Sequence, residues 1–335
     1  MLSSILFVGF SRFKELFPPQ ETFIETSVAD QSGKVFLVTG GSSGIGLELS
    51  RILFYRGGRV IVAGRSKKAY EEAVEYITST PVRGFETSKL RGALEFLYID
   101  LGDLTSIKPA ADELLSTVPR LDVAWYNAGV MMPPYGSKTK QGFELQWGTN
   151  VLGHFLLNKY ISSLQIATAA TAPKGSVRTI WVSSIAHHVG PEPAGINFSD
   201  INYENDPHAG KWTIYGQSKT GDIALAYEYA QQVADKGVAS WTLHPGNLRS
   251  NLTRHLDWFS RQFTYLMFAP TRYGALTELY AGLSPEPVMT GLSFKYIAPW
   301  GRIGALNDSV DNALKHENMG KDVWDLCEKQ VAPYI

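Results

Sequence analysis

From Val35 onward, short apolar runs alternate with longer stretches in which apolar and polar positions recur at helical spacing. The apolar runs predict strands at Val35–Val38, Val60–Ala63, Leu94–Ile99, Val123–Tyr126, Val177–Val182, Val238–Leu243 and Leu292–Ile297. The stretches between them predict helices at Ile45–Arg56, Ser66–Ser79, Asp103–Val118, Gly142–Leu164 and Tyr215–Ala234. Nearly continuous apolar strands separated by helices are typical of a parallel sheet buried on both faces. We therefore expect a doubly wound α/β fold of Rossmann type, with about seven strands in a single domain.

Two stretches interrupt this alternation. Residues 185–214 are rich in Gly, Pro, Asn and Asp, and residues 251–287 contain many aromatic side chains. Loops of this length inside a compact domain are usually functional or disordered. We expect the second stretch, about 250–290, to be a lid over a hydrophobic or aromatic substrate. The alternative is that its aromatic side chains pack in the core or in a dimer contact.

The first 30 residues are expected to form an N-terminal arm ahead of a main domain at 31–335. Apolar residues within 1–17 recur at helical spacing, but the run is shorter than the ~20 residues of a membrane span. No positive segment precedes this run, so a cleaved signal peptide is not expected. The arm is predicted to pack on the body of the protein. The alternative is an interfacial helix that rests on a membrane surface.

Composition excludes several classes of function. The 335 residues include 31 Lys and Arg against 32 Asp and Glu, with no long basic run, so we expect no nucleic-acid partner. The single cysteine, Cys327, cannot form an intramolecular disulfide, which fits a reducing compartment or indifference to redox state. A cytoplasmic location is expected. The spacing of the histidines matches no common zinc pattern, and no metal is expected. The histidines considered are His187, His188, His208, His244 and His255.

A glycine-rich turn, T-G-G-S-S-G-I-G at Thr39–Gly46, follows the first predicted strand and opens the first helix. Free backbone N–H groups and the helix dipole at such a position bind anions, and glycines let a pyrophosphate approach the backbone. The spacing differs from the commoner G-x-G-x-x-G, and the alternative is a tight connection without a ligand. The residues expected to bind a dinucleotide here are Gly40, Ser42, Ser43, Gly44, Ile45 and Gly46.

The ends of the next strands supply further candidates. Arg65 follows the second strand, where an acidic residue would hold the ribose hydroxyl of NAD, whereas an Arg can pair with the 2′-phosphate of NADP. NADP is therefore the expected cofactor, and the alternative for Arg65 is a solvated surface side chain. The third strand ends in Asp100-Leu101, which we expect to contact the adenine. The fourth strand ends in Asn127-Ala128-Gly129, whose small residues we expect to let a flat cofactor pass over the backbone. For Asp100, the alternative is a helix cap.

The candidate catalytic residues lie on and around one helix. Tyr215 and Lys219 are four residues apart, so they share a helix face. A neighbouring ammonium lowers the pKa of a phenol, which makes the pair a usable acid–base catalyst. Ser184 ends a strand and can polarise a carbonyl oxygen, although its neighbour Ser183 could take that place. Asn150 lies upstream, within the predicted fourth helix.

In this order, these motifs resemble the short-chain dehydrogenase/reductase family from about Gly33 to the C-terminus. Within that family the chain most resembles the retinol-dehydrogenase-like reductases, on V-S-S-I-A-H-H at Val182–His188 and H-P-G at His244–Gly246. Many fungal reductases of secondary metabolism are similar. The resemblance implies that Tyr215 is the proton donor, that Lys219 lowers its pKa and holds the nicotinamide ribose, and that Ser184 binds the substrate oxygen.

The resemblance also implies that Asn150 orders a water in the proton relay, and that family members often dimerise through the Tyr215 helix. The residues it implies at the nicotinamide end are Pro245, Gly246, Asn247, Leu248 and Ser250. We expect an NADP(H)-dependent oxidoreductase that interconverts a carbonyl and an alcohol on a hydrophobic small molecule. The alternatives are a non-catalytic NADP-binding regulatory or scaffold protein, and the same chemistry at a membrane surface on a retinoid or lipid.

Overall fold

The computed structural model describes residues 13–249 and 268–335, and one eight-stranded sheet runs through these residues. The strand order is β3-β2-β1-β4-β5-β6-β7-β8. The strands are β1 (Val35–Thr39), β2 (Arg59–Gly64), β3 (Ala93–Tyr98), β4 (Val123–Tyr126), β5 (Val177–Val182), β6 (Val238–Leu243), β7 (Tyr296–Ala298) and β8 (Arg302–Ile303). The first seven pair in parallel, and β8 pairs antiparallel with β7. The doubly wound α/β fold is confirmed, with one short strand more than expected.

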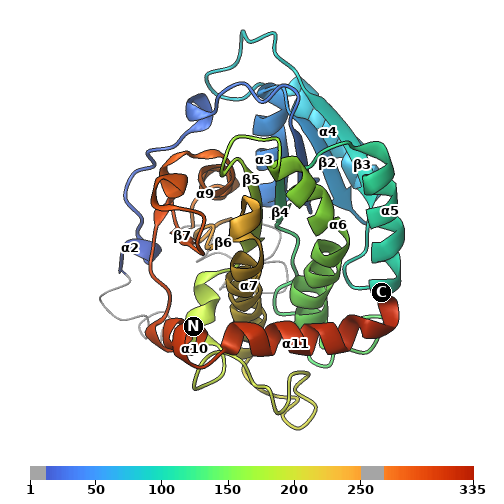
Figure 1. The fold of residues 1–335 in the computed structure, drawn as a ribbon, viewed down its shortest axis with the longest axis vertical. Coiled ribbons are helices and arrows are strands. Elements are labelled where there is room, and N and C mark those ends of the chain that lie inside the picture. Colours follow the sequence, from blue (N-terminus) through green and yellow to red (C-terminus); the bar gives the residue numbers. More distant parts are fainter. Residues whose placement is uncertain (1–12, 250–267) are drawn as a thin grey trace.

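Helices cover both faces of the sheet (Figure 1). On one face α3 and α9 pack against each other and, with α4, bury the side chains of one core cluster. On the other face α5, α6 and α7 form the second cluster, and α11 lies across the ends of α6 and α7. The helices are α2 (Phe13–Leu16), α3 (Gly44–Tyr55), α4 (Lys67–Ser79), α5 (Ile107–Thr117), a π-helical η4 (Trp147–Leu152), α6 (Gly153–Ala169), α7 (Lys211–Val233), α9 (Thr271–Leu283), α10 (Asp308–His316) and α11 (Met319–Val331).

The order of the strands locates the ligand-binding edge. The chain winds outward from β1 to β3 and then returns to place β4 on the other side of β1. In open α/β sheets, ligands bind outside the carboxyl ends of the strands at such a reversal. The glycine-rich turn follows β1 and the Asn127 tripeptide follows β4, so both lie at this reversal.

Several predicted boundaries are wrong. The predicted helix at Gly142–Leu164 cannot begin at Gly142, whose φ of 86° lies outside the helical region. Helix α7 begins four residues earlier than the predicted start, at Lys211, and its first turn belongs to the stretch expected to be a loop. The last predicted strand is shorter and later than expected, at Tyr296–Ala298, because the chain turns at Gly291 (φ 95°) before it.

The predicted lid at about 250–290 contains a core helix. Helix α9 (Thr271–Leu283) is buried from Gly274 to Gly282 and packs against α3 and the sheet. Residues 271–283 therefore belong to the body of the domain. For these residues the alternative interpretation, packing in the core, applies in place of a lid. Residues 250–267, which hold most of the aromatic side chains of this stretch, lie outside the described residues.

The described part of the predicted N-terminal arm packs on the body of the protein. The Tyr296 hydroxyl donates to the buried Glu15 carboxylate at 3.2 Å, and the Arg302 guanidinium donates to the Lys14 carbonyl at 2.8 Å. Arg272 on α9 forms an ion pair with Glu25 at 2.6 Å. These contacts tie residues 14–25 to β7, β8 and α9, whereas residues 1–12 lie outside the described part of the chain.

Candidate active site

The glycine-rich turn presents free donors at the start of α3. Ser43 is the N-cap residue of α3, with extended backbone and no capping bond from its side chain. The first N–H groups of a helix have no partner within the helix, so they remain available to an anion. Gly44 has a φ of 56°, and a Cβ there would meet nothing within 4 Å. The backbone therefore has the conformation and the open space that a pyrophosphate needs.

Gly46 has a different role from its neighbours in the turn. A Cβ on Gly46 would lie 2.6 Å from the Gly40 carbonyl oxygen and 2.6 Å from the Asn127 amide nitrogen. The Asn127 amide in turn donates to the Thr39 carbonyl at 2.8 Å. Gly46 therefore allows α3 to pack closely on the turn, which agrees with the third glycine of related turns.

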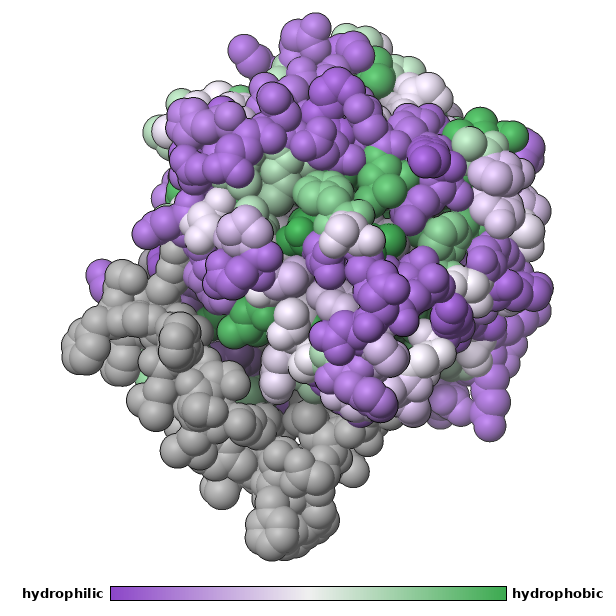
Figure 2. All heavy atoms as spheres, turned by 90° about the horizontal axis from the view of Figure 1, so that it is seen from below, coloured by the Kyte–Doolittle hydropathy of each residue, from purple (hydrophilic) through white to green (hydrophobic). Residues whose placement is uncertain are grey.

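A cleft of about 870 Å³ runs along the carboxyl ends of the strands. It is lined by every residue predicted to bind the cofactor except Gly46, which packs beneath the turn, and Ser250, which lies outside the described residues. Ser184 also lines it, but the buried Asn150 does not. Figure 2 views the end of the molecule where the 190–210 loop lies and shows apolar side chains in hollows surrounded by a polar rim. The residues therefore fit a dinucleotide with a substrate beside it.

Arg65 lies at one end of this cleft with an exposed side chain. Its guanidinium is 4.0 Å from an Asp100 carboxylate oxygen, and 68% of the side chain is accessible. The same Asp100 oxygen accepts a hydrogen bond from the Gly102 backbone N–H at 3.0 Å. The alternative role expected for Asp100, that of a helix cap, is filled by Asp103, whose carboxylate accepts a hydrogen bond from the Thr105 N–H. Arg65 is thus held only loosely and can turn toward a phosphate at this end.

The two adjacent serines differ in what their hydroxyls contact. The Ser183 hydroxyl is buried and donates to the Lys219 carbonyl on α7 at 2.7 Å. The Ser184 hydroxyl is hydrogen-bonded to Tyr215 and accepts from the Ala186 N–H at 3.2 Å. Ser183 therefore fixes α7 to the end of β5, and Ser184 is the serine that faces the phenol.

Tyr215 and Lys219 are both buried on α7, with the ammonium 5.9 Å from the centre of the phenol ring. Lys219 Nζ donates to the Val182 carbonyl and to the Asp222 carboxylate, both at 2.8 Å. Burial raises the pKa of Tyr215, and this outweighs the lowering by the Lys219 ammonium and by the Ser184 hydroxyl. The predicted direction of the Lys219 effect is present, but the net pKa shift of the phenol is upward.

Asn150 lies in the π-helical turn η4, and its side chain holds other parts of the site. Its amide donates to the Val130 carbonyl and to the Ser218 hydroxyl, both at 3.0 Å, and its oxygen accepts from the Val130 N–H at 2.8 Å. The Asn150 backbone carbonyl bonds His154 at 2.8 Å. Asn150 therefore joins the strand end after β4 to α7, and its predicted role in a proton relay stays a prediction.

Sequence reasoning missed several groups of this site. Asp222 follows Lys219 by three residues, a spacing that places both on one helix face. The Thr39 hydroxyl bonds His154 at 3.0 Å and accepts from the Ala128 N–H at 3.0 Å, so it fixes the end of β4 against the turn. The spacing of Asp222 was a usable signal, whereas the Thr39 contacts join residues far apart in the sequence.

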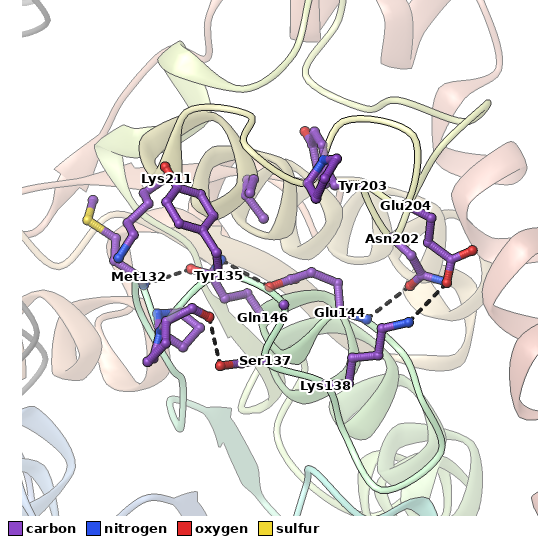
Figure 3. Close-up of a pocket in the computed structure, with 15 residues that line it drawn as sticks. Met132, Tyr135, Ser137, Lys138, Glu144, Gln146, Asn202, Tyr203, Glu204 and Lys211 are labelled. Carbon is purple, nitrogen blue, oxygen red and sulfur yellow. Dashed lines mark hydrogen bonds and ion pairs between the residues drawn. The ribbon is translucent and has the colours of Figure 1, made fainter.

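A second cavity of about 340 Å³ lies beside the cleft, between the chain after β4 and the start of α7. Figure 3 shows its wall, where Lys138 pairs with Glu204 at 3.1 Å and Lys211 lies against Tyr135. Glu144 accepts from the Trp147 N–H at 2.7 Å. Each of these charged groups already has a partner, which is an opposite charge, the backbone or an aromatic ring, so the arrangement suits structure rather than chemistry.

Metal-binding clusters and membrane-spanning helices are both absent from the described parts of the chain. Within residues 13–249 and 268–335, His, Cys, Asp and Glu side chains nowhere gather in groups of three or more that could hold a metal ion. None of the helices described there combines the length and apolar character needed to cross a bilayer. Of the histidines considered above, His255 lies outside these ranges.

A glycine-rich turn at the reversal of a parallel sheet, with Ser184, Tyr215 and Lys219 at the same edge, defines a Rossmann-type oxidoreductase with a nicotinamide cofactor. Residues 34–195 match the family model of the short chain dehydrogenases. The chain is 38% identical over 331 residues to a short-chain dehydrogenase/reductase of Phomopsis amygdali, with 96% of each chain covered. It belongs to the short-chain dehydrogenase/reductase family.

Two more comparisons agree with this assignment. The short-chain dehydrogenase/reductase pkfC of Emericella nidulans is 38% identical over 321 residues, which cover 95% of this chain and 98% of pkfC. A solved structure of a Mycobacterium paratuberculosis protein is 26% identical, with a TM-score of 0.66 over 92% of this chain and 96% of that one. The likeness therefore extends beyond the cofactor-binding half to nearly the whole chain.

Proposed function

We propose that this chain is an NADP(H)-dependent reductase that converts a carbonyl group on a hydrophobic small molecule into an alcohol. The observation that carries the proposal is that Ser184, Tyr215 and Lys219 line one cleft with the glycine-rich turn. The carbonyl carbon would accept a hydride from the bound nicotinamide, while its oxygen accepts the Tyr215 proton, giving the alcohol and the oxidised cofactor.

The preference for NADP rests on the charge at the end of β2. Arg65 has an exposed guanidinium that reaches only a carboxylate 4.0 Å away, and Lys67 and Lys68 follow at the start of α4. An added 2′-phosphate would give Arg65 a stronger, bidentate partner. The Ser42 hydroxyl lies at the same end, 3.9 Å from where a Cβ on Gly64 would be.

The role of Tyr215 follows from its protonation. Burial raises the pKa of its phenol, so the phenol keeps its proton at neutral pH and can donate it to a carbonyl oxygen. Ser184, hydrogen-bonded to the phenol, would bind the same oxygen and direct it toward Tyr215. The Lys219 ammonium has one donor beyond its bonds to Val182 and Asp222, and this donor can bind a ribose hydroxyl.

A hydrophobic substrate is supported by the cleft wall near Ser184 and Tyr215. The apolar side chains lining the cleft include Met131, Ile185, Trp212 and Phe268. Ligand sites of this kind are mostly apolar, with a few polar groups that fix orientation. Retinoids, lipids and aromatic natural products all fit such a wall, and the likeness to retinol-dehydrogenase-like reductases remains part of this proposal.

The test combines cofactor binding with turnover. NADPH and NADH are titrated against the wild type, Arg65→Asp and Tyr215→Phe, with nicotinamide fluorescence as the readout. NADPH is expected to bind more tightly, and Arg65→Asp is expected to remove the preference. A lost charged hydrogen bond of roughly 1.5–3 kcal/mol corresponds to roughly ten- to hundredfold in affinity.

Tyr215→Phe should bind NADPH like the wild type but lose at least roughly a hundredfold in the rate of reducing an aromatic quinone such as phenanthrenequinone. If neither nucleotide binds, the hypothesis that the protein is an enzyme fails, and a non-catalytic scaffold protein with the same fold becomes the better hypothesis. If NADH binds as tightly as NADPH, the cofactor assignment fails while the reaction class stands.

A further inference from the structure

Asp222 is a buried carboxylate next to the proposed catalytic lysine. It lies on α7 three residues after Lys219 and accepts a hydrogen bond from Nζ at 2.8 Å, with the side chains only 6% and 4% exposed. A buried charge destabilises a protein unless it is paired, and a buried pair is often no more stable than apolar residues of similar volume. Stability alone therefore does not explain why a carboxylate stands here.

The groups around this pair leave its two charges facing each other. On α7 itself, the Tyr215 ring lies near the Lys219 ammonium. Cys327 on α11 is close enough to Asp222 for the carboxylate to raise the pKa of its thiol, and His154 on α6 is close enough to Lys219 for the ammonium to lower its pKa. Burial raises the pKa of the Cys327 thiol and lowers the pKa of His154 to about 3, so both are neutral near pH 7. Among these groups, only Lys219 and Asp222 are charged at neutral pH.

The two charges act on Tyr215 in opposite directions. The Lys219 ammonium lowers the pKa of the phenol, whereas the Asp222 carboxylate raises it. Burial raises the pKa of Asp222 to about 6, so the carboxylate is ionised at neutral pH. Burial lowers the pKa of Lys219, but the carboxylate reverses this and keeps the ammonium charged. Without the carboxylate, a lysine in this buried position would lose its proton more easily.

This dependence has a consequence for the phenol. Of the two charges, the ammonium has the larger effect on Tyr215, so its loss would raise the pKa of the phenol further. An acid–base catalyst works best when its pKa stays close to the working pH. The carboxylate therefore supports Tyr215 by keeping Lys219 charged.

We propose that Asp222 is a positioning residue that holds the Lys219 ammonium against the Val182 carbonyl and keeps it charged beside Tyr215. This inference rests on the proposed role of Tyr215 as the acid–base group. Asp222 acts through Lys219 and does not itself line the cleft.

The test is Asp222→Asn, which keeps an oxygen acceptor of the same shape and removes the charge. The ultraviolet absorbance of tyrosinate is titrated with pH in each protein and in its Tyr215→Phe counterpart, and the difference isolates Tyr215. The midpoint of the Tyr215 titration is expected to rise by roughly one pH unit, because an uncharged lysine no longer stabilises the phenolate. The rate of phenanthrenequinone reduction by the NADPH-loaded enzyme should begin to decline at a lower pH than in the wild type, because Lys219 then loses its proton earlier.

Two further variants keep the result interpretable. Asp112→Asn removes a carboxylate that pairs with Lys108 on the surface of α5, and it should leave the midpoint unchanged. Asp222→Ser leaves space for water around Lys219 and should shift the midpoint in the same direction if the Asn variant does not fold.

A Tyr215 midpoint that is unchanged or lower in the Asp222 variants overturns this inference. The proposed function is judged separately, because it fails if Tyr215→Phe retains wild-type turnover, whatever the titration shows. A higher midpoint with a Tyr215→Phe enzyme that remains fully active would leave Asp222 as a modulator of a phenol that is not the catalyst.

Discussion

At the scale of single residues, the site depends on a competition between burial and charge at Tyr215. The phenol is 5% exposed, and burial raises its pKa more than Lys219 and Ser184 lower it. The sequence alone predicts the i, i+4 pair and the direction of the lysine effect. It does not predict how deeply the pair is buried, because α10 and α11, which cover α7, come about a hundred residues later in the chain.

Gly46 provides a sharp test of how the glycine-rich turn is built. In Gly46→Ala, the new methyl group would lie 2.6 Å from the Gly40 carbonyl oxygen and 2.6 Å from the Asn127 amide nitrogen. The Gly40 oxygen belongs to the backbone, so it cannot move aside as a flexible side chain would. Overpacking of this kind costs about 1–3 kcal/mol. We expect a lower midpoint of thermal unfolding and weaker NADPH binding, because the turn must move away from α3.

The matched control is Gly64→Ala. A Cβ there would meet only the Ser42 hydroxyl at 3.9 Å, and its φ is not in the left-handed region. The thermal midpoint of this variant should stay close to the wild type. Equal midpoints in the two variants would show that the turn adjusts to a methyl group at Gly46 without cost.

At the scale of elements, sequence pattern predicts the strands better than the helices that follow β6, since α9, α10 and α11 were not predicted. Strands β1, β2 and β4 to β6 lie where their apolar runs predict them, since a strand buried on both faces leaves a continuous apolar signal. Helix α9 leaves no such signal, because it is buried on nearly all sides and has no polar face to mark its period. The lid prediction rested instead on the aromatic residues that precede α9 in the same stretch.

Helix α9 carries a buried acid whose titration should affect stability. The Glu278 carboxyl is 0% exposed, and neither oxygen has a hydrogen-bond partner. Burial raises its pKa well above the ordinary range, so the folded protein holds this carboxyl protonated. The unfolded chain ionises above about pH 4.3. The folded pKa is the higher one, so the contribution to stability is full below about pH 4.3 and is lost as pH rises.

Glu278→Gln removes this dependence, because an amide is neutral in both states. We expect the variant to gain stability over the wild type as pH rises, by up to roughly 1.4 kcal/mol per pH unit, when urea unfolding is compared from about pH 5 to about pH 8. A stability difference that is constant across this range would mean that Glu278 is ionised in the folded protein.

At the scale of the whole molecule, the C-terminal helices determine which surfaces are free. All residues of α7 from Ile214 to Ala226 are buried. Helix α11 contributes to this with Val323, Cys327 and Val331, each 0% exposed, and Trp324 stacks on Tyr229 with ring centroids 6.1 Å apart. Figure 1 shows α11 lying across the ends of α6 and α7. The face of α7 through which the resemblance implies a homodimer is therefore filled by this chain's own C-terminal region.

We expect the protein not to dimerise through this face of α7, because a second copy would have to displace α11. Light scattering coupled to size-exclusion chromatography at micromolar concentration measures the mass of the particle in solution.

Val323→Asp places a charge against α7 and should loosen α11, so the apolar face becomes accessible and the fraction of higher-mass species rises. Asp322→Asn changes the exposed neighbouring residue and should leave the mass distribution unchanged. A stable wild-type dimer whose cross-links map to α7 would instead mean that α11 leaves this face in solution.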